Sequence, residues 1–144
     1  ARQGFYNGVI FHRVIDGFMA QTGDPTGTGQ SGSTLPDLTA EFNAIPHVRG
    51  TVSMARTNEP NTANSQFFIV FYPRFALDHK YTNFGRVISG MDNVDAITRG
   101  EPPANPTKVV QASIAADNKA APAPVAPAAA PAITADMLSN SRSN

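Results

Sequence analysis

Arg13 stands in a largely apolar segment rich in β-branched residues, which is an unusual setting for a charged side chain. The side chains of a strand alternate between its two faces. Counting by twos therefore gives three faces, one with a cation among apolar residues and two with a glutamine beside apolar residues. They are Val9, Phe11, Arg13 and Ile15; Met19 and Gln21; and Gln66, Phe68 and Val70. If these three faces converge, they line an apolar pocket that contains one cation and two amides. Such a pocket suits a neutral peptide and is poorly suited to hydrolysis.

A second explanation of Arg13 stays open at this point. An arginine flanked by large apolar residues commonly pairs with an acidic side chain or extends its guanidinium into water. The residues alone do not separate this structural role from a role in a pocket.

Other patterns with chemical potential are weak. His12, His47 and His79 are far apart in the sequence and none has the spacing of metal ligands, so we expect no metal site. The chain lacks cysteine and the G-x-S-x-G motif of many hydrolases. Residues 27–32 match the dinucleotide-binding pattern G-x-G-x-x-G, but prolines flank them where a strand and a helix would be needed. We interpret this run as a flexible loop and expect no cofactor.

The composition argues against several classes of partner. The 144 residues carry 11 basic and 11 acidic side chains, so we expect neither nucleic acid nor an anionic membrane as a partner. No apolar run approaches the roughly 20 residues of a membrane span. With 41% hydrophobic residues, the chain can form one core.

The aromatic residues divide the chain into a body and a tail. All nine Phe and three Tyr fall between Phe5 and Phe84, whereas 14 of the 18 residues from Ala115 to Ala132 are Ala or Pro. A segment so poor in large side chains cannot offset the entropy of ordering itself. We therefore predict a folded domain over 1–114 and a flexible tail over 115–144, in which Thr134 caps a weak helical turn at 133–138.

The body reads as short strands separated by turn residues. Asp16-Gly17 is a hairpin dipeptide and predicts that the segments on either side of it pair antiparallel. Gly100 is placed to end a short helix predicted over 91–98. Six strands are predicted, at 9–15, 18–22, 51–56, 66–71, 84–88 and 108–114. These elements indicate a mostly β domain, either a barrel or a sandwich.

Three long motifs, in the same order, resemble the signatures of the cyclophilin family. They are Phe11–Ile15 with Gly17–Asp24, which match F-H-R-[VI]-I-x-x-F-M-x-Q-x-G-D; Asn64–Ile69, which match x-S-Q-F-F-I; and Leu77-Asp78 with Phe84–Val87. The resemblance covers roughly 4–114, and Met54–Thr57 has the bacterial form of its segment.

The resemblance implies a closed eight-stranded antiparallel β-barrel capped by two helices. Our six strands are two short of that number. Cyclophilins carry two strands and a helix ahead of the position where this sequence starts, so residues 1–6 resemble the end of the first helix and the loop after it. We therefore expect the first two strands and most of the first helix to be absent from these 144 residues, which would leave strand edges unpaired.

The resemblance also implies an activity, the cis/trans isomerisation of X-Pro peptide bonds in protein substrates. The residues that match its catalytic positions are Arg13, Gln21 and Gln66, with the two amides orienting Arg13 and the substrate backbone. The residues that match its substrate-binding positions are Phe18, Met19, Ala55, Arg56, Phe68, Leu77 and Tyr81. His12 accompanies the arginine in the motif, but its alternation predicts that it faces away and is structural.

Two positions depart from many eukaryotic relatives. Ala76 falls where they carry a tryptophan, and Tyr81 falls where they carry a histidine. Tyr81 keeps a ring and a hydrogen-bonding tip. The missing indole predicts weak binding of the immunosuppressant cyclosporin, unless neighbouring Phe75 fills part of the gap.

The expected partners are proline-containing polypeptides, and we expect a monomer. Relatives of the bacterial type occur both in the cytoplasm and in the periplasm, and of these two we favour the periplasm. The alternative function is a non-catalytic module that holds proline-containing segments as a chaperone or scaffold. Arg13 argues against this alternative, because binding alone does not require a cation at the amide.

Overall fold

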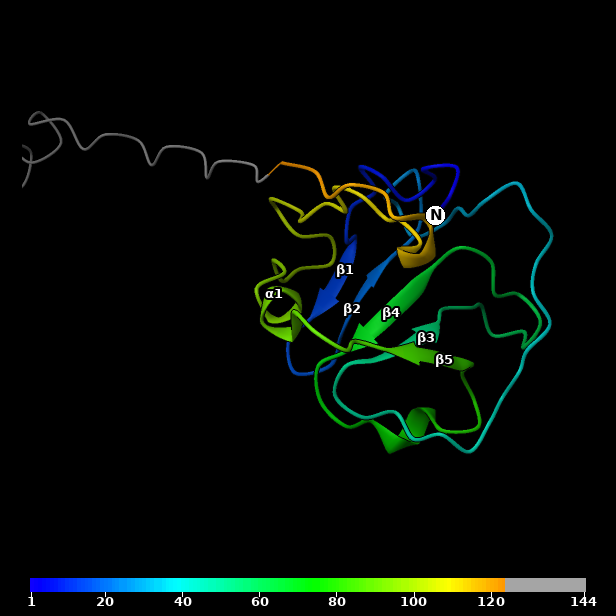
Figure 1. The fold of residues 1–144 in the computed structure, drawn as a ribbon. Helices are drawn as coiled ribbons and strands as arrows, with labels where there is room; N and C mark the ends of the chain where they lie inside the picture. The colour runs from blue at the N-terminus through cyan, green and yellow to red at the C-terminus, as the bar shows by residue number, and fades with distance from the viewer. Residues whose placement is uncertain (124–144) are drawn as a thin grey trace, which may run out of the picture.

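The computed structural model describes residues 1–123, which form one antiparallel sheet with few helical turns (Figure 1). The elements are β1 (Arg13–Ile15), β2 (Met19–Thr22), β3 (Thr51–Met54), β4 (Phe67–Val70), a 3₁₀ turn (Phe75–Leu77), β5 (Asn83–Arg86), α1 (Met91–Asp95) and a second 3₁₀ turn (Ala115–Asp117). The strands are ordered β1-β2-β4-β3-β5, and every neighbouring pair is antiparallel.

The β1–β2 hairpin confirms the prediction made from Asp16-Gly17. Gly17 adopts a φ of 66°, a conformation that favours glycine and lets the chain reverse tightly. The resulting register places Arg13 opposite Gln21. Because β2 pairs with β4 so that Gln21 lies opposite Phe68, the three side chains form a row across one face of the sheet.

Each face of the sheet carries its own apolar cluster. One cluster contains Phe11, Val14, Ala20, Phe71 and Ile97, and α1 packs against it through Met91 and Val94. The other cluster contains Met19, Phe68 and Val70, with Phe18, Ala55, Leu77 and Tyr81 partly buried around it. The two faces follow from the period of two, since Val14 and Ala20 alternate with Arg13 and Met19 along their strands.

The predicted sixth strand is wrong. Within residues 1–123 the sheet has five strands and is not closed, and the segment 108–114 makes only an isolated bridge between Lys108 and Ile10. Three backbone hydrogen bonds join 107–109 to 8–11, and the pairing stops there. Farther along, Val110 and Ile114 are 56% and 39% exposed, so no second strand covers this segment. Closure into an eight-stranded barrel stays a prediction.

The predicted helix over 91–98 is also too long. It ends at Asp95, and the Ala96 N–H bonds to the Asp92 carbonyl. The guanidinium of Arg99 donates to the carbonyl oxygens of Asp95 and Ile97, which satisfies acceptors that a longer helix would have used. Gly100 is therefore not the end of the helix; it exchanges two backbone hydrogen bonds with Val14 at the outer edge of β1.

The predicted boundary at residue 115 falls at the second 3₁₀ turn, where Asp117 accepts two hydrogen bonds from Arg2. The turn predicted at 133–138 lies outside the described residues. No helix within 1–123 is long and apolar enough to cross a membrane.

Candidate active site

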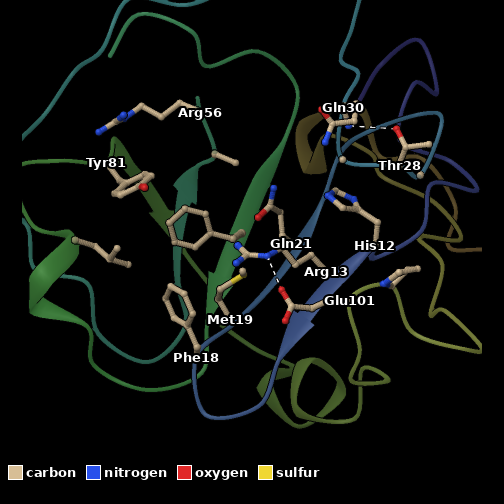
Figure 2. A pocket seen from close by; sticks show the side chains of 16 residues that line it. His12, Arg13, Phe18, Met19, Gln21, Thr28, Gln30, Arg56, Tyr81 and Glu101 are labelled. Carbon is tan, nitrogen blue, oxygen red and sulfur yellow. Dashed lines mark hydrogen bonds and ion pairs between the residues drawn. The ribbon is translucent and has the colours of Figure 1, made fainter. Parts of the chain in front are cut away.

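An open pocket of about 680 Å³ lies on the Met19–Phe68 face of the sheet (Figure 2). Its lining comes from β1, β2 and β4, from the loops at 27–30, 55–56 and 77–81, and from the segment at 101–102. The residues are His12, Arg13, Phe18, Met19, Gln21, Gly27, Thr28, Gly29, Gln30, Ala55, Arg56, Phe68, Leu77, Tyr81, Glu101 and Pro102.

Nine of the ten residues proposed from the sequence line this pocket. The tenth, Gln66, lines an adjoining hollow of about 670 Å³ that shares Gln21, Ala55 and Arg56 with the first. The three strand faces therefore meet only in part: Arg13, Met19, Gln21 and Phe68 line one pocket, whereas Phe11, which alternation placed with Arg13, packs in the cluster on the other face of the sheet.

Arg13 forms no hydrogen bond with the two glutamines that were expected to orient it. Its Nε donates a hydrogen bond of 2.8 Å to Oε1 of Glu101, which is 88 residues away in the sequence. The side chains of the pair are 45% and 52% exposed. Both explanations of Arg13 thus hold together, because the guanidinium pairs with an acid and also lines the pocket.

The two glutamines bond to each other instead. Gln21 donates through Nε2 to Oε1 of Gln66 at 2.9 Å. Gln66 in turn donates through its own Nε2 to the carbonyl oxygens of Gly29 and Ser31, at 3.1 and 2.8 Å. The amide pair therefore joins the sheet to the loop that carries the G-x-G-x-x-G pattern.

That loop is ordered by Asp24, a fully buried carboxylate. Burial alone would raise the pKa of Asp24, but hydrogen bonds from the hydroxyl and backbone N–H of Thr26 and from the N–H of Ser31 outweigh it and lower the pKa to about 2. The pattern at 27–32 is confirmed as a loop without the flanking strand and helix of a dinucleotide site.

An aromatic and aliphatic wall faces Arg13. Met19 and Phe68 are buried, and the Tyr81 ring meets the Phe68 ring edge-on at 5.8 Å. Behind this wall, the buried ring of His47 bonds through Nδ1 to Asp78 at 2.8 Å and through Nε2 to Ser53 at 3.0 Å. These bonds fix the segment after Leu77 against the sheet.

Arg56 enters the site through its side chain as well as its backbone. Its guanidinium lies 4.6 Å from the centre of the Tyr81 ring and donates two hydrogen bonds to the Lys80 carbonyl, at 2.7 and 3.0 Å. The contact holds Tyr81 between a cation and Phe68.

The prediction that His12 faces away from the site is wrong. His12 is 6% exposed and lines the pocket, and neither ring nitrogen has a hydrogen-bond partner. Burial lowers its pKa, which favours the neutral ring. The loop holds it in place from one side, since a Cβ at Gly29 would lie 3.2 Å from the ring. Alternation failed here because β1 begins only at Arg13, so His12 lies outside the strand whose period of two was applied to it.

Sequence reasoning did not place the loop at 27–30, Pro102 or Glu101 in the pocket, and Glu101 is the charged residue among them. The signal available was general: an arginine in an apolar strand requires an acidic partner or water. Which of the acidic residues it meets depends on how the segment after α1 returns to β1. No group of three or more metal-ligating side chains occurs in the part of the chain that the structure describes.

The fold and the pocket together define a class of protein: an antiparallel β protein with an open, largely apolar pocket in which the Arg13 guanidinium lies on the same face as Met19 and Phe68. A sequence model described as cyclophilin type peptidyl-prolyl cis-trans isomerase/CLD matches residues 1–115. The chain belongs to this family, whose members are isomerases.

Similar proteins agree with this assignment. A probable peptidyl-prolyl cis-trans isomerase of Brucella abortus (strain 2308) is 51% identical over 134 residues, which cover 82% of this chain and 68% of the relative. The crystal structure of cyclophilin AquaCyp293 from Hirschia baltica matches with a TM-score of 0.74 and 31% identity, over 81% of this chain and 62% of that one. A Cryptosporidium parvum cyclophilin, crystallised in the presence of the dipeptide Ala-Pro, matches with a TM-score of 0.71 and 32% identity over 76% of each chain.

Proposed function

We propose that this protein accelerates cis/trans isomerisation of X-Pro bonds in proline-containing polypeptides and so assists their folding. The observation that carries the proposal is the placement of Arg13 in the pocket, facing a wall that includes Met19 and Phe68. A proline ring is apolar and uncharged, and thioether and aromatic surfaces suit it.

The proposed mechanism follows from the amide bond. Rotation about an X-Pro bond must break C–N resonance against a barrier of about 18–20 kcal/mol. A site that binds the twisted amide better than either planar form lowers this barrier without covalent chemistry. In the twisted state the lone pair localises on the proline nitrogen, and a guanidinium can donate a hydrogen bond to it or to the carbonyl oxygen. Arg13 therefore acts electrostatically, because a guanidinium does not release its proton.

The other roles follow from the placement around Arg13. Phe18, Met19, Phe68 and Leu77 form the receptacle for the proline ring. Ala55 and the backbone of Arg56 hold the substrate as an extended chain. The Arg56 guanidinium, which contacts the Tyr81 ring, holds that ring at the rim of the pocket. The amide pair of Gln21 and Gln66 keeps the 27–32 loop at the pocket edge, which places the loop beside the substrate.

A direct isomerisation assay tests the proposal. A peptide with one X-Pro bond, followed by protease-coupled absorbance or by exchange NMR, should interconvert much faster with the full-length protein than alone. Binding of the peptide without acceleration would instead support the non-catalytic chaperone or scaffold.

Cyclosporin should bind weakly, and Ala76→Trp should strengthen binding by at least about tenfold, since an indole offers some 200 Å² of apolar surface. Ala76 is exposed and directly precedes Leu77 of the pocket wall. Isothermal titration of both proteins measures the change.

Phe75→Ala is the matched control for the cyclosporin experiment. Phe75 is 63% exposed and does not line the pocket, so its removal should leave the affinity within about twofold of the unmodified protein. Nanomolar affinity in the unmodified protein, lost in Phe75→Ala, would show that Phe75 takes the place of the tryptophan.

A further inference from the structure

We propose that Glu101 is a positioning residue for Arg13 and that its carboxylate holds the guanidinium in the orientation needed at the X-Pro amide. This inference rests on the proposed function and adds a residue that none of the family motifs in the sequence contains. Figure 2 shows the contact, with the Glu101 carboxylate beneath the Arg13 guanidinium and the hydrogen bond drawn between them.

The backbone fixes Glu101 beside β1. Its neighbour Gly100 donates to the Val14 carbonyl at 2.9 Å and accepts from the Val14 N–H at 2.8 Å. Gly100 has a φ of 142°, and a Cβ there would lie 2.6 Å from the Cα of Pro103, so the close return of the chain requires glycine. Because Gly100 pairs with the residue after Arg13, the next side chain along its segment reaches the guanidinium.

A second link ties the same two segments together. Arg99 donates from Nε to Oδ1 of Asp16 in the hairpin turn, at 3.2 Å. Its guanidinium also lies 4.3 Å from the centre of the Phe71 ring in the core. The segment that carries Glu101 is therefore anchored through Arg99 and through Gly100, the two residues that precede Glu101.

The contact with Glu101 leaves the terminal N–H groups of the Arg13 guanidinium free. A guanidinium has five N–H donors, and Glu101 takes the one on Nε. Within residues 1–123, no other side chain bonds to this guanidinium, so its four terminal N–H groups are available to a substrate. A carboxylate bonded to Nε fixes the plane of the guanidinium. A preorganised donor loses less conformational entropy when it bonds the twisted amide than a mobile donor does.

The isomerisation rate of three full-length variants tests the inference. Glu101→Ala should lower kcat/KM by about tenfold, mainly through kcat, because a donor out of place weakens binding of the twisted amide more than binding of the planar substrate. Glu101→Gln should recover most of the loss, since its amide oxygen still accepts from Nε. Asp117→Ala is the matched control: it removes a carboxylate that bonds an arginine, Arg2, outside the pocket and should leave kcat/KM within about twofold.

A double-mutant comparison shows whether Glu101 acts through Arg13. In an Arg13→Ala background, Glu101→Ala should cause no further loss. An equal tenfold loss in both backgrounds would overturn the inference. A faster Glu101→Ala enzyme would also overturn it, because the carboxylate would then reduce the electrostatic effect of the guanidinium on the amide.

NMR of the Arg13 Nε–Hε group separates this inference from the proposed function. Its signal, assigned by its loss in Arg13→Ala, should exchange with water faster in Glu101→Ala than in the wild type. If the wild type does not accelerate isomerisation, the proposed function fails, and this measurement still decides whether Glu101 holds Arg13. Unchanged exchange would overturn the contact itself.

Discussion

Replacing Arg13 with alanine in the full-length protein should lower kcat/KM for an X-Pro peptide by at least about a hundredfold, because the loss of one preorganised electrostatic donor costs roughly 3 kcal/mol in the transition state. The fold should survive the change. Arg13 is about half exposed, and its ion pair with Glu101 is open to solvent, so the pair contributes little to stability. A protease-coupled or NMR isomerisation assay gives the rate, and circular dichroism with a urea titration checks the fold.

The conservative variant sharpens this prediction. Arg13→Lys keeps the charge but replaces a planar fork with a point-like ammonium that cannot bond Glu101 and the amide in the same geometry. It should also be slow. Near-normal rates in Arg13→Ala would remove Arg13 from the mechanism, and a fast Arg13→Lys would show that charge alone is sufficient.

Asp24→Asn should destabilise the folded protein by about 2 kcal/mol at pH 7, since each unit of pKa shift corresponds to about 1.4 kcal/mol. The folded-state pKa of Asp24 is about 2, below the ordinary value of 3.8. A lowered pKa means that the ionised form stabilises the fold. This contribution is complete above about pH 4 and is lost as the pH falls toward 2.

Urea unfolding of the wild type and the variant between pH 7 and pH 2 measures this dependence. The difference in free energy of unfolding should stay constant down to about pH 4 and then shrink toward pH 2, because Asp24 protonates in the unfolded chain while it is still ionised in the fold. Asp16→Asn serves as the control, because Asp16 is 84% exposed and its loss should change stability by less than about 0.5 kcal/mol. A gap between wild type and Asp24→Asn that persists at pH 2 would mean that the amide destabilises the loop by its shape and not by its charge.

Much of the site could be predicted from local features of the sequence. Asp16-Gly17 predicted the hairpin because a tight turn between two β-rich runs leaves one simple pairing. The period of two placed Met19 with Gln21 and Gln66 with Phe68, and the register of the strands in the structure brings Arg13, Gln21 and Phe68 onto one face. The family motifs then identified nine residues that line one pocket. Each of these inferences depends on residues close together in the chain or on a pattern of faces.

The errors occurred where an element depends on a distant partner. The segment 108–114 has the composition of a strand, but a strand exists only where a neighbour supplies hydrogen bonds, and the pairing with 8–11 ends near Val109. The helix at Met91 was predicted too long because the Arg99 side chain, and not a glycine, satisfies its last carbonyls. Composition alone does not show whether a segment finds a strand partner or which donor satisfies the last carbonyls of a helix.

The sequence by itself determined the faces of β2 and β4, the hairpin, the family and the residue types that can bind a proline-containing peptide. Only the tertiary structure decided which groups meet: Arg13 with Glu101, Gln21 with Gln66, and the unpartnered ring of His12 with the pocket. Strand periodicity extends over a few residues and is set by backbone sterics, so the pattern of the sequence is enough to predict it. The Arg13–Glu101 contact spans 88 residues and follows from the path by which Gly100 returns to Val14, a result of the packing of the whole chain.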